Sequence, residues 1–266
     1  MARSALLNVM VQAALKAGKS LSRDFGEVQN LQVSVKGPGD FVSQADLKAE
    51  KIVRDELLKA RPTYDFLGEE GGEEKGTDGA HRWIVDPLDG TTNFLHGIPQ
   101  FAVSIALERN GEIVAGVIFN PATDELFTAE RGGGAFLNDR RIRVAARKTL
   151  PDCVIACGVP HLGRGNHGKF LVELRHVMGE VSGIRRMGAA ALDLAYVAAG
   201  RVDGFWEANL SPWDIAAGIV LIREAGGFVS DMKGTQDMFT SSTVVAGNEY
   251  IHKALVEVVN RPVPAK

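Results

Sequence analysis

The chain has 266 residues, of which 45% are hydrophobic and 24% are charged, as in an ordinary globular protein. Its formal net charge is −3, whereas nucleic-acid-binding proteins usually have an excess of basic residues. No apolar run reaches the roughly 18 residues that a membrane span requires. The two cysteines, Cys153 and Cys157, are expected to be small buried residues in a reducing cytoplasm rather than a disulfide or a thiolate site.

The first 60 residues predict two helices separated by a loop. In the N-terminal run MARSALLNVMVQAALKAGKS, polar residues recur at helical spacing, which indicates an amphipathic helix and not a signal peptide: Asn8, Gln12 and Lys16. A second helix is expected from about Gln44 to Ala60, because Pro62 cannot continue it. Between the two helices, Gly37-Pro38-Gly39 predicts a flexible, exposed segment.

Short strands are expected to follow, with these bounds: Tyr64 to Gly68, Trp83 to Asp86, Phe101 to Arg109, Glu112 to Asn120 and Glu125 to Ala129. Asn110-Gly111 predicts a two-residue hairpin turn between the third and fourth of them. Gly132-Gly133-Gly134 resembles a phosphate loop, but Ala135-Phe136-Leu137 continues as a strand. A hairpin turn is therefore expected there.

After about Leu150, strand-like runs alternate with four helical ones: Asn166 to Met178, Ala189 to Ala199, Pro212 to Ala225 and Glu249 to Val259. Such alternation predicts helices packed on a sheet. We therefore divide the chain into residues 1–150, a helix pair with a mainly antiparallel sheet, and residues 151–266, an α/β part. The two parts are expected to complete one site in a single integrated unit.

Acidic residues occur where three apolar segments meet turns or helix starts. In WIVDPLDGTTN a strand leads to Asp86 and Asp89, and in FLGEE another leads to Glu69. In SPWD, Ser211 is expected to cap a helix whose first turn contains Asp214. Each feature alone has a structural interpretation, as a turn, a solvated strand end or a complement to the helix dipole.

Taken together, these carboxylates indicate a metal site. None of the three segments contains the His or Cys that zinc prefers, and an all-oxygen set suits Mg²⁺ or Mn²⁺. Gly90-Thr91-Thr92 offers backbone donors at the start of a short helix, where a phosphate can bind. The chemistry predicted is metal-assisted phosphate hydrolysis with two ions.

Three motifs in the same order resemble those of the inositol monophosphatase family: GEE, DPLDGTTN and WDIAAGIVLIREAGG. The resemblance extends over essentially the whole chain. It implies an α/β fold, a layered αβαβα sandwich of the inositol monophosphatase and fructose-1,6-bisphosphatase type. It also implies a homodimer, two or three Mg²⁺ ions that Mn²⁺ can replace, and inhibition by Li⁺.

The resemblance also implies roles for individual residues. The metal ligands would be Glu69, Asp86, the Leu88 carbonyl, Asp89 and Asp214. Catalysis would use Glu69, with Thr91 orienting the attacking water and Asp46 behind it. The substrate would be bound by Asp89, Gly90, Thr91, Gly188, Ala190, Glu207 and Asp214. Lys36 could reach the phosphate, whereas His96, Arg185 and Arg186 are given no catalytic role.

The leading hypothesis is an enzyme, a Mg²⁺-dependent phosphoric monoester hydrolase acting on myo-inositol monophosphate or a related polyol phosphate. A phosphatase of the same superfamily acting on fructose 1,6-bisphosphate, histidinol phosphate or a nucleotide 3′-phosphate stays open, and a bisphosphate would require an extra basic cluster. The resemblance also leaves open a partner of RNA polymerase or its elongation factors, with secondary catalysis. Because repelling carboxylates need a reason to stay together, a purely structural role is disfavoured.

Overall fold

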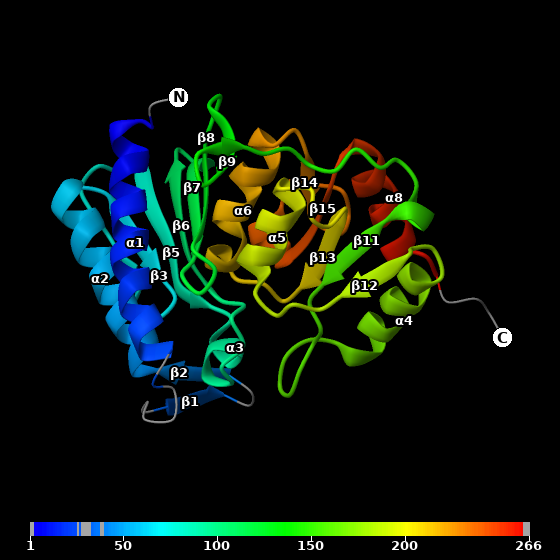
Figure 1. Cartoon of the computed structure of the whole chain (residues 1–266), viewed down its shortest axis with the longest axis horizontal. Helices are drawn as coiled ribbons and strands as arrows, with labels where there is room; N and C mark the ends of the chain where they lie inside the picture. Colours follow the sequence, from blue (N-terminus) through cyan, green and yellow to red (C-terminus); the bar gives the residue numbers. More distant parts are fainter. Residues whose placement is uncertain (1–2, 26, 28–32, 38–39, 263–266) are drawn as a thin grey trace.

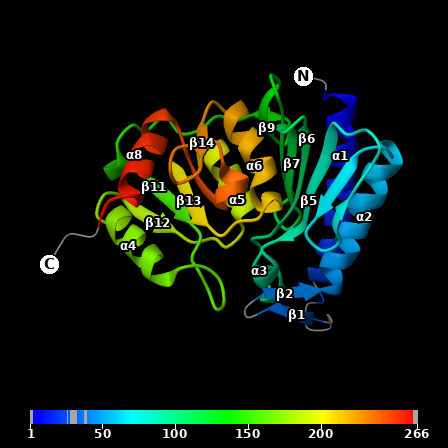
Figure 2. The same ribbon diagram turned by 180° about the vertical axis from the view of Figure 1, so that it is seen from behind.

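The structure is a computed structural model that describes residues 3–25, 27, 33–37 and 40–262, with backbone only for residues 33–37 and 40–42. Its elements stack in five layers: a helix pair, an eight-stranded sheet, a second helix pair, a five-stranded sheet and a third helix pair (Figures 1 and 2). The predicted αβαβα sandwich is therefore confirmed. The division at residue 150 stays a prediction, although the two sheets lie on either side of it in the sequence.

The first outer layer consists of α1 (Ala5–Phe25) and α2 (Gln44–Ala60). As predicted, α1 is amphipathic: Met10 and Ala14 are among the residues of its buried face. The expected loop between the helices is partly wrong, because β1 (Val33–Gly37) and β2 (Asp40–Ser43) pair as an antiparallel hairpin. The hairpin forms because two β-compatible runs flank Gly37-Pro38-Gly39. Residues 38–39 and the Lys36 side chain lie outside what the structure describes.

The first sheet is antiparallel except where β3 and β5 pair in parallel. The turn at Asn110-Gly111 is confirmed, with φ of 51° and 80°, and so is the hairpin at Gly132-Gly133-Gly134. In their order across the sheet, the strands of the first sheet are β10 (Arg140–Arg141), β9 (Gly134–Leu137), β8 (Glu125–Glu130), β7 (Glu112–Asn120), β6 (Ala102–Arg109), β5 (His81–Asp89), β3 (Asp65–Gly68) and β4 (Gly72–Glu74).

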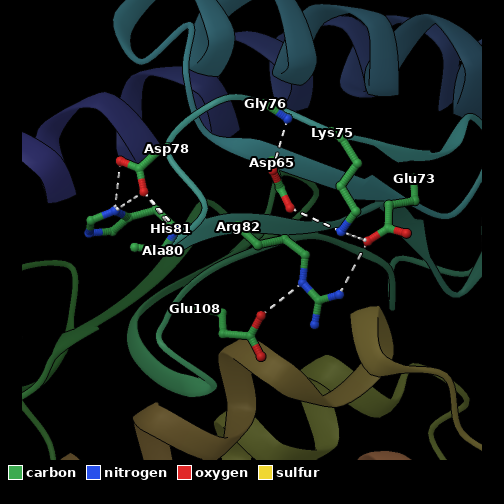
Figure 3. A network of polar contacts seen from close by, with 9 residues as sticks. All are labelled: Asp65, Glu73, Lys75, Gly76, Asp78, Ala80, His81, Arg82 and Glu108. Atoms are coloured by element: carbon green, nitrogen blue, oxygen red, sulfur yellow. Dashed lines mark hydrogen bonds and ion pairs between the residues drawn. The ribbon is translucent and has the colours of Figure 1, made fainter.

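A polar network holds the beginning of β5 in register (Figure 3). Arg82 and Glu108 are directly opposite each other on β5 and β6, and Arg82 Nε donates to Glu108 Oε2 at 2.8 Å. On the β3 side, Lys75 Nζ donates to Asp65 Oδ2 at 3.0 Å. Ion pairs that remain partly exposed to solvent add little stability. They do fix the start of the strand whose far end contains Asp86 and Asp89.

The middle layer consists of α5 (Ala190–Ala198) and α6 (Pro212–Glu224), which pack between the two sheets. Helix α5 is almost entirely buried, and α6 is buried from Ile215 to Ile222. Close packing on β7 requires Gly116, because a Cβ atom there would lie 2.8 Å from the Ala217 carbonyl oxygen. This layer brings the first turns of α5 and α6 against the end of β5.

The second sheet is parallel across β12, β11 and β13 and antiparallel beyond, and α4 (His167–Met178) and α8 (Glu249–Val259) form the outer layer. Its strands in order are β12 (Gly183–Arg185), β11 (Val154–Cys157), β13 (Gly204–Ala208), β15 (Thr243–Gly247) and β14 (Phe228–Ser230). Cys153 and Cys157 are buried and free, as predicted. Among the described residues, no helix is long and apolar enough to cross a membrane.

Candidate active site

A cavity of about 320 Å³ lies where the end of β5, the start of α6 and the loop after β11 meet. Among its lining residues are nearly all those predicted for the site: Glu69, Asp86, Leu88, Asp89, Gly90, Thr91, Gly188, Ala190, Glu207 and Asp214. Asp46 is fully buried behind Thr91 and does not line the cavity. The fold thus brings together segments as far apart in the chain as Glu69 and Asp214.

The end of β5 is shaped by an irregularity in its pairing with β6. Asp86 faces Ser104 and Asp89 faces Ala102, so three steps on β5 match two on β6. Pro87 lies in this bulge, where no ladder N–H is needed. The Leu88 N–H donates to Asp86 Oδ1 at 3.0 Å, and the Ala191 N–H of α5 donates to Asp89 Oδ2 at 2.7 Å. The bulge directs both carboxylates toward the cavity.

Glu69 is held by the turn that follows β3. Its N–H donates to the Val85 carbonyl at 3.2 Å. The next two backbone N–H groups, of Glu70 and Gly71, donate to the Glu50 carboxylate of α2 at 2.8 and 2.6 Å. Glu50 is buried, but it was not predicted, because nothing in the local sequence of α2 distinguishes it from a solvent-exposed helix glutamate.

Two Ser-x-x-Asp capping boxes place further carboxylates in or beside the site. At the start of α2, Ser43 donates its N–H and its hydroxyl to Asp46 Oδ2, at 2.9 and 2.5 Å. Asp46 Oδ1 lies 3.0 Å from Thr91 Oγ1, which lies equally close to the Leu88 carbonyl oxygen. At the start of α6, the Ser211 N–H donates to Asp214 Oδ2 at 2.7 Å.

The carboxylates repel one another across the cavity. Burial, and then the charges of Glu69, Asp89 and Asp214, raise the pKa of Asp86 well above its usual range. Burial, followed by the charge of Asp214, raises the pKa of Asp89 to about 8, although the Ala191 N–H opposes the shift. Within the described part of the chain, neither Asp86 nor Asp89 forms an ion pair with a basic side chain. This end of the cavity therefore favours a bound cation.

The donor chemistry fits Mg²⁺, since these side chains offer only oxygen ligands. Over the residues that the structure describes, no group of three or more His, Cys, Asp or Glu side chains is arranged to hold a metal ion. Mg²⁺ is usually bound through one or two carboxylates, with water and phosphate oxygens completing the shell. The carboxylates that line the cavity together with Leu88 offer such oxygen ligands without a closed protein cage.

Glu207 and the turn that contains Gly188 also line the cavity. Burial, and then the charges of Asp214 and Asp89, raise the pKa of Glu207 to about 8, while Arg186 and Arg164 oppose the shift. Gly188 has a φ of 85°, which favours glycine. Asn93, the last residue of the DGTTN motif, donates to the Met187 carbonyl at 2.8 Å and so fixes this turn beside α3 (Thr91–Leu95).

Several lining residues were not predicted. The loop after β11 contributes Gly158, His161 and Arg164, and Arg186, which was given no catalytic role, reaches the same cavity. The loop gives only a turn signal in the sequence, with three glycines between residues 158 and 165. His96 is exposed and its Nδ1 lies 2.7 Å from the Thr92 carbonyl oxygen, so its interpretation as a loop residue is confirmed.

A five-layered sandwich with a carboxylate-lined cavity between its sheets defines a phosphatase-type α/β protein. The chain belongs to the inositol monophosphatase family, whose model matches residues 2–263. The predicted membership of this phosphatase family is thereby confirmed.

Similar proteins cover the whole chain. An inositol-1-monophosphatase of Rhizobium meliloti (strain 1021) is 76% identical over 100% of both chains. The Nus factor SuhB of Pseudomonas aeruginosa is 44% identical over 97% of each. The solved structure of extragenic suppressor protein suhB from Bartonella henselae is 67% identical and superimposes with a TM-score of 0.96, covering 98% of this chain and 100% of that one.

Proposed function

We propose that the protein is a Mg²⁺-dependent phosphatase that hydrolyses myo-inositol monophosphate, or a closely related polyol phosphate, to the alcohol and inorganic phosphate. One observation carries the proposal: four carboxylates line the same cavity as Glu207. They are Glu69, Asp86, Asp89 and Asp214. The family and the relative named as an inositol-1-monophosphatase support the choice of substrate.

Glu69, Asp86 and the Leu88 carbonyl would hold one Mg²⁺ ion, and Asp86, Asp89 and Asp214 would hold a second. When bound, the ions supply charge neutralisation at the phosphate and lower the pKa of water. Mn²⁺ is expected to replace Mg²⁺, and Li⁺ to inhibit. Burial and mutual repulsion disfavour the anionic forms of Asp86 and Asp89, and a bound cation would offset that cost.

Thr91 and Asp46 would orient the attacking water. Thr91 Oγ1 has two acceptors at 3.0 Å, Asp46 Oδ1 and the Leu88 carbonyl oxygen, so its single proton is directed away from the cavity. Its lone pairs then accept a hydrogen bond from water. Asp46 is fixed by Ser43, and Glu69 would serve as the base on the cavity side.

Gly90, Thr91 and the carboxylate-bound ions would bind the phosphate, and Glu207 would accept hydrogen bonds from ring hydroxyl groups. The backbone at Gly188 and Ala190 would line the ring. Glu207 supports a neutral polyol, since a carboxylate disfavours a second anionic group at its position.

A second candidate substrate is a sugar bisphosphate such as fructose 1,6-bisphosphate. The specific observation is the basic rim: Arg164 and Arg186 line the cavity and form no ion pair within the described part of the chain. Guanidinium groups bind phosphate well. Histidinol phosphate and nucleotide 3′-phosphates remain alternatives that share the same metal end.

A further candidate function is that of a partner of the transcription machinery, because a relative that is 44% identical is named a Nus factor. We propose testing it by a pull-down with RNA polymerase and its elongation factors at increasing salt. Absence of binding would remove this candidate. A homodimer and a cytoplasmic location stay predictions, and sedimentation of the purified protein would test the first of them.

The proposed activity is tested by phosphate release from four esters, with and without Mg²⁺: myo-inositol 1-phosphate, fructose 1,6-bisphosphate, histidinol phosphate and adenosine 3′,5′-bisphosphate. Asp89→Asn is the blank. We expect Mg²⁺-dependent release that is fastest on the inositol ester. Faster release from the bisphosphate would favour the second candidate, and no release from any ester would refute the phosphatase proposal.

A further inference from the structure

Glu207 does not stand away from its strand but lies across the backbone of Gly158. A Cβ atom built on Gly158 would be 1.8 Å from Glu207 Cδ, 2.0 Å from Oε1 and 2.2 Å from Oε2. Non-bonded carbon and oxygen atoms require about 3.4 Å or more. The whole carboxylate therefore occupies the space that any side chain at residue 158 would take.

The pairing of β11 with β13 explains this contact. Cys157 and Trp206 are register partners in parallel strands, and the Gly158 N–H donates to the Trp206 carbonyl at 3.3 Å. Gly158 and Glu207 are thus the next neighbours across the sheet, and side chains at such positions emerge on the same face. A residue with a side chain at 158 would compete directly with Glu207.

The backbone gives no other reason for glycine here. Gly158 is not among the residues with positive φ, so an alanine could adopt its conformation without strain. The atoms that a Cβ would displace belong to the flexible end of a glutamate and not to a backbone. Replacing Gly158 should therefore move the carboxylate and leave the fold intact.

Glu207 also has a place to move. A second cavity of about 190 Å³ lies behind it, lined among others by Phe170, Glu173 and Trp206, and it shares Gly158 and Glu207 with the first cavity. The Glu207 side chain thus forms part of the wall between two cavities. Its position, and not its presence alone, decides the shape of the substrate side.

We infer that Gly158 is a specificity-determining residue: because it lacks a side chain, the Glu207 carboxylate lies back against the sheet, where it accepts hydrogen bonds from the hydroxyl groups of a ring substrate. This inference rests on the proposed phosphatase function. It predicts that a methyl group at residue 158 costs recognition of ring hydroxyls and nothing else.

The test compares Gly158→Ala with Gly168→Ala on two esters, myo-inositol 1-phosphate and p-nitrophenyl phosphate, which has no hydroxyl on its ring. The control is matched, because a Cβ atom at Gly168 would meet only Asn166 Oδ1, at 3.6 Å. We expect Gly158→Ala to lower kcat/KM for the inositol ester by about 10- to 100-fold, mainly through KM, as for loss of a hydrogen bond to a charged group. The p-nitrophenyl ester should change less than about twofold.

A double-variant cycle identifies the cause. Once Glu207→Ala has removed the carboxylate, adding Gly158→Ala should have almost no further effect on either ester. An equal loss on both esters, or an undiminished loss in the Glu207→Ala background, would overturn the inference. If Gly158→Ala does not fold, the double variant should still fold and match Glu207→Ala, because removing the carboxylate leaves room for the methyl group. A double variant that does not fold would also overturn the inference.

The wild-type rates separate this inference from the proposed function. Mg²⁺-dependent hydrolysis of both esters by the wild type, with an unchanged preference in Gly158→Ala, would refute the inference alone. No hydrolysis of either ester by the wild type would refute the proposed function, and the inference would fall with it.

Discussion

Replacing Asp89 by asparagine should stabilise the metal-free protein. Asparagine keeps an oxygen that can accept the Ala191 N–H now bound at 2.7 Å, but it removes a carboxylate that Asp214 and Glu69 repel. The folded-state pKa of Asp89, about 8, exceeds its ordinary value of 3.8. A raised acid pKa means that the folded state loses stability as pH rises from about 4 to about 8.

The magnitude follows from that difference in pKa. At pH 7 a shift of this size corresponds to on the order of 4 kcal/mol of destabilisation, against about 2 kcal/mol at pH 5. Because Asp89 is only half-buried and faces the cavity, solvent screening reduces the effect, and we expect about 2 kcal/mol at pH 7. For a chain of this size that is a Tm difference of roughly 4–8 °C.

The assay is thermal unfolding of both proteins in EDTA at pH 5, 6 and 7, and again with Mg²⁺. The variant should unfold at the higher temperature in EDTA, with a difference that grows with pH. Adding Mg²⁺ should raise the Tm of the wild type and leave Asp89→Asn nearly unchanged. Equal stabilities in EDTA at every pH, or an equal gain from Mg²⁺, would refute the reasoning about the acidic end.

Three further substitutions test the supports of the site. Thr91→Val should lower kcat about 10- to 100-fold with little change in KM, because it removes the water-orienting hydroxyl and keeps the backbone N–H beside the phosphate; an unchanged kcat would remove that role. Glu50→Ala should lower the free energy of unfolding by about 1–3 kcal/mol in urea denaturation, since the Glu70 and Gly71 N–H groups lose their acceptor, whereas an unchanged midpoint would show that water replaces it. Asn93→Ala should raise KM for the inositol ester about fivefold or more by releasing the turn at Gly188, and unaltered kinetics would remove that role.

The parts that could be predicted from the sequence are those fixed by local chemistry. Helix α2 begins at Gln44 and ends at Ala60 as expected, because a Ser-x-x-Asp box starts it and Pro62 follows. The same box starts α6 after Ser211. Asp86 and Asp89 could be found because a strand followed by Pro, Gly and two Thr is unusual for a plain turn.

The parts that could not be predicted depend on contacts between distant segments. Glu50 accepts hydrogen bonds from backbone groups about 20 residues away, and Arg164 lines the cavity from the loop after β11, far in sequence from Asp86. The β1–β2 hairpin was expected to be a loop, since its glycine and proline signals outweighed its short β runs. The strand predicted to end at Asp86 continues to Asp89, because a bulge in its pairing with β6 extends β5. The sequence of β5 alone does not show that bulge.

The most direct measurement of the central claim is the initial rate of phosphate release from myo-inositol 1-phosphate as Mg²⁺ is added back to EDTA-treated protein. We expect a rate at the blank level without Mg²⁺, a saturable rise as the ion is added, and no rise in Asp89→Asn. Release that persists in EDTA, or a Mg²⁺ response retained by the folded variant, would contradict it.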